Sequence, residues 1–509
     1  MCCHCMNRRE FMELAMTASA GVVTGLGAGA AGGVHAAGTT WQDISWEPSR
    51  PLYTVSRPLR VLPVLMYRVP RKREMTSYKS WGGVQSHEIA AEESERISGE
   101  WCGLRDSIGF PLEVQPVVRV TNPEEAAQID HSRVDLTVVY PATGSGDTLR
   151  ACIPERGAVL FARHKSGPVY YWYEALSTRY LAKTGEQPDT DRRVSVRDVV
   201  IDNLDELRWR LRAWNAVNNL IGCRVATLGG FQGKYAPEAP EIAHRKWGIE
   251  IINLTYADFE KRLKAAFADP SLMAQAERWA DTFLSLPGTA LETERSYVVN
   301  AFVLYALFKQ FMAESGASVF SIMDCMSAIM PMSRTTACLT LGLLNDEGLI
   351  AFCESDFVVI PAGILLRHIA GVPVFMHNST FPHDEGIVTC AHCACPRRLD
   401  GQGYAPARIL THYESDFGAA PKVEMPLGQL VTFINPEYAT GRWLGMRGEV
   451  RDNPFYEICR SQQDVQILGP WERLLNEVRD SHWMMAYGDH LQTAGYAASK
   501  IGVQWDPLV

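Results

Sequence analysis

Short apolar runs alternate with amphipathic segments along the first 200 residues. Runs of the length of buried strands occupy residues 60–67, 117–120, 134–140 and 158–162. Helical spacing of acidic and apolar residues occupies 87–104, and an amphipathic helix is predicted over 202–219. Alternation of strands and helices is typical of an α/β protein with a doubly wound sheet. We therefore predict a first α/β domain over residues 45–200.

The same alternation continues to about residue 350 and then changes. Strands are predicted at 224–228, 247–254 and 318–322, with a long helix over 295–313. Beyond about residue 400, short strands are separated by Gly, Pro and Asn, which is typical of a β-rich unit. A helix at 471–479 and a strand at 482–487 follow. We predict a second α/β domain over 201–350 and a β-rich C-terminal domain over 351–509.

The N-terminal segment has the pattern of an export signal. Arg8 and Arg9 precede an apolar, Gly/Ala-rich stretch over 14–31, and the small-x-small sequence at 34–36 resembles a cleavage site. We expect residues 1–37 to be a twin-arginine signal peptide and the protein to be periplasmic or extracellular. The alternative is a membrane anchor, but the stretch is short and Gly-rich for a span, and no later run reaches the roughly 18 uninterrupted apolar residues that a span needs.

Composition narrows the class of partner. Hydrophobic residues make up 47% of the 509 residues and charged residues 21%, as in globular proteins. Forty-nine basic and 58 acidic residues give a net charge of −9 without long runs of one sign. A nucleic-acid-binding protein would carry a basic patch, so we expect small molecules or metal ions as partners.

Two carboxylates follow an apolar run at 349–353. Glu354 and Asp356 are two positions apart, which in a strand places both on one face. The carboxyl end of an α/β strand borders a ligand crevice, and acids there suit a divalent metal or general-base catalysis. The alternative is a pair of solvated loop acids.

Histidines interrupt two later strand-like runs. His392 lies within the small, apolar segment 389–395, and His482 begins the apolar run 482–487. Each is a candidate metal ligand, and each has a buried core histidine as its alternative. His392 could also form a zinc site with Cys390 and Cys393, although a single CxxC without a second pair is a weak signal. Carboxylates combined with these imidazoles favour Mn²⁺, Mg²⁺ or Fe²⁺ over structural Zn²⁺.

The order of these motifs resembles the L-fucose/L-arabinose isomerase superfamily, and its shorter fucose-isomerase-like members in particular. The resemblance runs from about residue 58 to the end of the chain. It is carried by the segments 345–356, 391–393, and His482 with 487–490, and by the N-terminal segments 81–83 and 164–168.

The resemblance implies a fold, an activity and an assembly. Members interconvert aldoses and ketoses with a divalent metal, usually Mn²⁺. They have two Rossmann-like domains followed by a barrel-like C-terminal domain, and they assemble as trimers or hexamers. Carried over residue by residue, it implies metal positions at Asp356, Glu354 and His482, and a metal- or substrate-binding role for His392. We also expect Trp81 and His490 to contact the sugar; the alternative for Trp81 is a core tryptophan, and the alternative for His490 is a residue in the first turn of the next helix.

One departure from the family pattern concerns the catalytic base. The family has another acid about 20–30 residues before its Glu-x-Asp segment, and Asp324 is the only acid in the corresponding region 321–327. Isomerisation needs a base that is not weakened by metal coordination, so Asp324, or Glu354 if Asp356 holds the metal, is the candidate. Without such an acid, the protein could be a non-catalytic carbohydrate-binding protein; a lyase or epimerase with the same chemistry is a third alternative.

Overall fold

The computed structural model describes residues 41–179, 193–437, 441–477 and 481–509. The predicted signal at 1–37 lies outside this described part. Close contacts divide the chain into two compact units. Of the described residues, unit one comprises 57–208 and unit two comprises 41–56 and 209–509, so the boundary falls within helix α6 (Leu204–Leu220).

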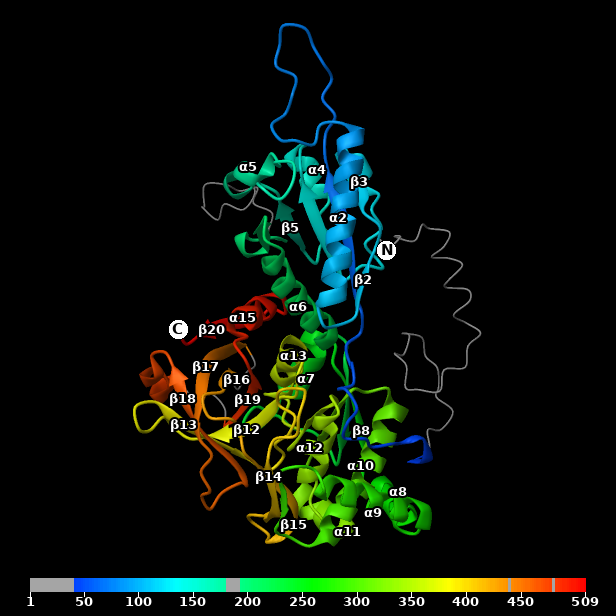
Figure 1. Ribbon diagram of the computed structural model, residues 1–509, viewed down its shortest axis with the longest axis vertical. Coiled ribbons are helices and arrows are strands. Elements are labelled where there is room, and N and C mark those ends of the chain that lie inside the picture. The colour runs from blue at the N-terminus through cyan, green and yellow to red at the C-terminus, as the bar shows by residue number, and fades with distance from the viewer. Residues whose placement is uncertain (1–40, 180–192, 438–440, 478–480) are drawn as a thin grey trace. The chain divides into compact units, whose positions relative to one another are not determined.

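Unit one consists of a parallel sheet with helices packed against it (Figure 1). The sheet order is β2-β1-β4-β5-β6, and β3 also pairs with β1; every pairing is parallel. The strands β1, β4 and β5 consist mainly of buried apolar residues, as strands covered on both faces should. The strands are β1 (Leu59–Met66), β2 (Leu112–Val114), β3 (Val118–Val120), β4 (Leu136–Pro141), β5 (Ala158–Ala162) and β6 (Val199–Ile201). The helices are α2 (His87–Ser107), α3 (Pro123–Ala127), α4 (Gly146–Ala151), α5 (Trp172–Arg179) and the short η3 (Val196–Asp198).

Unit two begins with a second parallel sheet, in the order β11-β10-β7-β8. Its strands are β7 (Arg224–Leu228), β8 (Glu250–Leu254), β10 (Val319–Ile322) and β11 (Ile350–Phe352). Its helical elements are η2 (Trp41–Asp43), α7 (Ala239–Trp247), α8 (Tyr256–Phe267), α9 (Pro270–Leu284), α10 (Arg295–Ser315), the π-helical η4 (Cys325–Ile329), α11 (Met330–Ser333), α12 (Cys338–Asp346) and α13 (Ile360–Ala370). Helix α10 packs against α9 and α12 (Figure 1). Among the described residues it alone has the length and hydropathy to cross a membrane, and most of it is buried in the core.

The C-terminal part of unit two contains a closed six-stranded barrel. The order is β16-β19-β12-β13-β18-β17, all antiparallel, and pairing of β17 with β16 closes it. Strand β20 (Gln504–Pro507) pairs in parallel with the first residues of β17. The barrel strands are β12 (Phe375–Ser379), β13 (Ile387–His392), β16 (Leu430–Pro436), β17 (Arg442–Asp452), β18 (Ser461–Leu468) and β19 (His482–Tyr487). Three further strands form a small sheet beside it: β9 (Thr289–Leu291), β14 (Ala407–His412) and β15 (Phe417–Val423). The remaining helices are η5 (Trp471–Arg473), α14 (Leu474–Glu477) and α15 (Leu491–Lys500).

The prediction of a mixed α/β protein with parallel sheets and a β-rich, barrel-like C-terminal part is confirmed. The division into 45–200, 201–350 and 351–509 stays a prediction. Unit two holds both the second parallel sheet and the barrel, and one hydrophobic cluster contains residues of both, such as Phe320 and Phe433.

Candidate metal centre

The loop after β11 carries the first candidate ligand in an unusual backbone conformation. The strand ends at Phe352, and both Glu354 (φ 60°) and Ser355 (φ 44°) lie in the left-handed region. Two consecutive non-glycine residues of this kind are strained and persist only where the surroundings hold them. The predicted strand through the acid pair is therefore wrong, and Glu354 and Asp356 take different roles.

The loop after β7 holds this strained turn in place. The backbone N–H of Gln232 donates to the Ser355 carbonyl at 3.0 Å, and the Phe357 N–H donates to the Gln232 carbonyl at 2.8 Å. The side-chain amide of Gln232 also donates to the Glu354 carbonyl at 3.1 Å. Strands β7 and β11 flank β10 in a parallel sheet, so both loops leave the same edge.

Three side chains converge at this edge from distant parts of the chain. Glu354, His392 at the end of β13 and His482 at the start of β19 each offer a ligand atom, and these atoms all lie within 4.8 Å of one another. Glu354 Oε1 is 3.5 Å from His392 Nε2, and Glu354 Oε2 is 3.4 Å from His482 Nε2. Both histidines are buried, whereas the Glu354 side chain is 37% exposed, so the group is open on the carboxylate side.

Asp356 lies behind His482 rather than in the three-residue group. Its Oδ2 is 2.8 Å from His482 Nδ1, and its Oδ1 accepts hydrogen bonds from the backbone N–H groups of Lys234 at 3.0 Å and Val358 at 3.1 Å. A buried carboxylate on the far ring nitrogen fixes the orientation and tautomer of a metal-binding histidine. We therefore revise Asp356 from a predicted ligand and catalytic residue to a positioning residue.

The electrostatics match this arrangement. Burial lowers the pKa of His482, but the hydrogen bonds and charges of Asp356 and Glu354 outweigh it and raise that pKa to about 9. Burial also raises the pKa of Glu354, yet the hydrogen bonds of His392 and His482 hold it well below its ordinary value. Glu354 is therefore an ionised carboxylate, and His482, protonated at neutral pH because of its raised pKa, would release the proton on Nε2 as a cation binds.

Two neighbours of the group were not predicted from the sequence. Lys234 Nζ lies 3.4 Å from Glu354 Oε2, and its position after the Gly-rich segment that follows β7 could have indicated a loop at the ligand edge. His377 on β12 is buried, and burial together with the charges of His392 and His482 lowers its pKa to about 3, so it stays neutral. His377 directly follows the apolar run 372–376, and no spacing relates it to the other candidate ligands.

The other predicted site residues lie outside the group. Asp324 lies in the loop after β10, has a φ of 52° and is exposed. Because β10 and β11 are parallel neighbours, this loop lies at the same edge of the sheet as the loop that carries Glu354. His490 Nε2 hydrogen-bonds to the Tyr487 carbonyl at 2.8 Å, an interaction within the turn before α15. Trp81 belongs to unit one and is 69% exposed, which excludes a core role and leaves its contact with sugar a prediction.

The donor set fits a divalent metal. One carboxylate and two imidazoles, with open positions, suit Mn²⁺, Fe²⁺ or a similar ion. His392 Nδ1 is buried and has no hydrogen-bond partner among the described residues. The predicted alternative of a zinc site with Cys390 and Cys393 is wrong in its pairing, because the Cys390 thiol lies 4.0 Å from Ser379 Oγ while Cys393 groups with Cys338 and His412.

No protein-family model matches the chain, and a search of curated proteins finds no match. The resemblance to the L-fucose/L-arabinose isomerase superfamily therefore stays a prediction. A function can be inferred only from the arrangement of the site, in which Glu354, His392 and His482 converge. Asp356 contacts His482 from the other side of its ring.

Proposed function

We propose that this protein is a metal-dependent aldose–ketose isomerase acting on a neutral monosaccharide of the L-fucose or L-arabinose type. The observation that carries the proposal is the convergence of Glu354, His392 and His482 at the carboxyl edge of a parallel sheet, with Asp356 holding His482 in place. The architecture of parallel-sheet units followed by a barrel agrees with the resemblance, under which the two sheets would be Rossmann-like domains.

Glu354, His392 and His482 would hold the cation, for which Mn²⁺ is the expected ion. When bound, a divalent cation supplies positive charge beside the two substrate oxygens on which negative charge develops. Asp356 keeps a proton on His482 Nδ1, which leaves the Nε2 lone pair directed at the Glu354 side of the group. Lys234, 3.4 Å from Glu354, is positioned to donate a hydrogen bond to a substrate oxygen.

The proton moves between C1 and C2 of the sugar and needs a carboxylate that no cation occupies. Glu354 belongs to the metal group, and the oxygens of Asp356 are engaged by His482 and two backbone N–H groups. Asp324 is exposed at the end of the neighbouring strand and is the remaining predicted acid at this edge. We assign it the role of general base, a contribution of roughly 10²–10⁴-fold in rate.

The test is a ketose assay on the full chain loaded with Mn²⁺, with L-fucose, L-arabinose and D-arabinose as substrates in D₂O. We expect ketose formation with deuterium incorporated at C1 of the ketose, and loss of both in Glu354→Gln. The matched control is Glu292→Gln, which removes an exposed carboxylate that pairs with Arg408 elsewhere in unit two. Deuterium exchange without ketose would favour the epimerase or lyase alternative.

A non-catalytic carbohydrate-binding protein is the second candidate, and one observation favours it. Asp324 is exposed to solvent, and the oxygens of Asp356 are already engaged, so the site could hold a cation and a sugar without a base fixed beside C1 and C2. Sugar binding by calorimetry together with neither ketose nor exchange would support this alternative and contradict isomerisation.

The remaining parts of the proposal concern location and assembly. Export by the twin-arginine route would deliver the folded protein to the periplasm or the exterior, and assembly as a trimer or hexamer follows from the resemblance. Mass spectrometry of the mature N-terminus and sedimentation analysis test these two points separately.

A further inference from the structure

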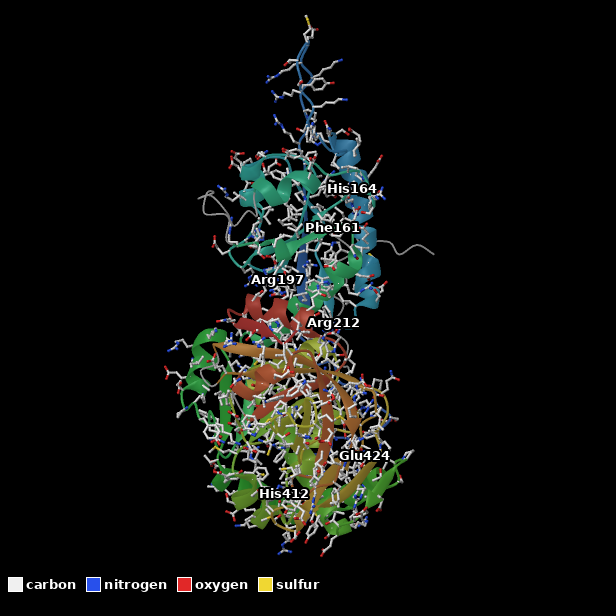
Figure 2. All side chains as sticks on the ribbon, turned by 90° about the vertical axis from the view of Figure 1, so that its left-hand side faces the viewer. Phe161, His164, Arg197, Arg212, His412 and Glu424 are labelled. Atoms are coloured by element: carbon white, nitrogen blue, oxygen red, sulfur yellow. The ribbon has the colours of Figure 1, made fainter. Side chains whose placement is uncertain are left out.

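A second group of ligand-type side chains lies in unit two. One ligand atom each of Cys338, Cys393 and His412 lies within 4.8 Å of the other two. All three residues are buried, with exposed fractions of 3%, 3% and 6%. Cys338 begins helix α12, Cys393 follows strand β13, and His412 ends strand β14, where Figure 2 labels it.

A third cysteine completes the group. The Cys459 side chain packs against Cys338 and Cys393, and its thiol hydrogen-bonds to that of Cys393. The Cys393 thiol also hydrogen-bonds to that of Cys338. Three sulfurs and one imidazole thus meet from four separate segments of the chain.

The histidine distinguishes this group from ordinary buried cysteines. Cys390 and Cys395 are buried thiols that pack like small apolar residues, and neither belongs to a group of three possible metal ligands among the residues that the structure describes. His412 Nδ1, in contrast, is buried and has no hydrogen-bond partner within the described part of the chain. Leaving a buried polar nitrogen unpaired is costly, and coordination of the ring removes that cost.

We propose that Cys338, Cys393, His412 and Cys459 form a structural Zn²⁺ site, distinct from the Glu354 centre. Three thiolates and one imidazole are a common ligand set for closed, tetrahedral zinc sites. Bonds of about 2.3 Å to zinc place neighbouring sulfurs about 3.8 Å apart in a tetrahedron. The separations among Cys338, Cys393 and His412, at most 4.8 Å, need only a small contraction to reach this geometry, and Cys459, whose thiol contacts that of Cys393, would move in as the fourth ligand.

The site would tie together segments that are far apart in sequence. It joins the start of α12, the end of β13, the end of β14 and the residues before β18. Cys393 directly follows His392, so zinc would also fix the end of the strand that carries a ligand of the first centre. Zinc here would therefore support the geometry of the Glu354 group without contributing an open coordination position.

The experiment uses the reduced full chain, freed of metal with a chelator and titrated with Co²⁺ as a spectroscopic substitute for zinc. We expect a thiolate-to-cobalt charge-transfer band in the near ultraviolet and the intense visible bands of tetrahedral Co²⁺, saturating at one equivalent. Zinc should displace this signal, and elemental analysis of untreated protein should find one zinc per chain.

Variants separate this site from the first centre. Cys338→Ala and Cys393→Ala should each abolish the charge-transfer band, whereas Cys390→Ala, a buried thiol on the same strand β13, should retain it. Glu354→Gln should also retain it, so failure of the proposed isomerase leaves this result untouched. No band in the wild-type chain, a band that persists in the Cys338→Ala and Cys393→Ala variants, or a disulfide between these cysteines in the purified protein would overturn the proposal.

Discussion

The hydrogen bond between Asp356 and His482 offers the sharpest test of the first centre. In Asp356→Asn, the amide oxygen can still accept from the Lys234 and Val358 N–H groups, at 3.0 and 3.1 Å in the wild type. The amide cannot replace the negative charge 2.8 Å from His482 Nδ1. The change therefore removes the orienting interaction and preserves the turn that contains it.

The size of the effect follows from what is lost. Hydrogen bonds to charged groups contribute about 1.5–3 kcal/mol. Mutation of a carboxylate behind a metal-binding histidine typically weakens metal affinity about 10–100-fold. At about 1.4 kcal/mol for each factor of ten, this loss of affinity corresponds to about 1.4–2.8 kcal/mol, which overlaps the range for the hydrogen bond. The stabilisation of the fold by saturating Mn²⁺ should fall by the same amount.

Calorimetric titration of the metal-free full chain with Mn²⁺ measures the affinity directly. The control is Asp464→Asn on β18, another buried carboxylate, whose Oδ1 accepts from the Thr389 hydroxyl at 2.6 Å. We expect weaker Mn²⁺ binding in Asp356→Asn and wild-type affinity in Asp464→Asn. Unchanged affinity in Asp356→Asn, or an equal loss in both variants, would refute the positioning role.

Three further predictions address catalysis, pH dependence and packing. Asp324→Asn should lower kcat by roughly 10²–10⁴-fold and leave Mn²⁺ affinity unchanged; wild-type turnover in this variant would exclude Asp324 as the base. Burial raises the pKa of Asp346 to about 7, so its folded form binds a proton more tightly than the unfolded chain does. The wild-type unfolding free energy should therefore fall, relative to Asp346→Asn, as pH rises from about 4 to about 7, and parallel profiles in urea unfolding would contradict this. Gly445→Ala should lower the melting temperature, because its Cβ would lie 2.0 Å from the Trp505 ring; an unchanged melting curve would show that the ring can move without cost.

Local pattern was sufficient for the strands buried on both faces and for several of the candidate residues at strand ends that the structure brings together. The runs at 158–162 and 224–228 were predicted with the bounds that β5 and β7 have, because strands buried on both faces are uniformly apolar. Glu354 and His482 were identified because a polar residue at the end of such a run is conspicuous. Barrel closure was not visible in the sequence, because the pairing of β16 with β17 depends on a register that only the assembled sheet fixes.

The other parts of the two candidate sites depend on backbone conformation and on contacts between distant segments, which local sequence patterns do not predict. The sequence predicts Asp356 as a ligand because it contains no sign that Glu354 and Ser355 leave the strand in a left-handed turn. It does not predict Cys338 and Cys459 as ligands, because metal motifs are recognised by short spacing, and these cysteines are separated from Cys393 by many residues.

Strand β20 pairs with an edge of β17 that would otherwise have no partner among the described strands. The long strand β17 pairs with β18 through its later residues, and β20 takes up the same side of residues 442–445. Deleting the chain from Gln504 onward would uncover a row of unpaired N–H and C=O groups, the kind of template on which neighbouring molecules add strands and aggregate. Residues 504–507 thus cover an edge of β17 to which a strand of another molecule could otherwise add.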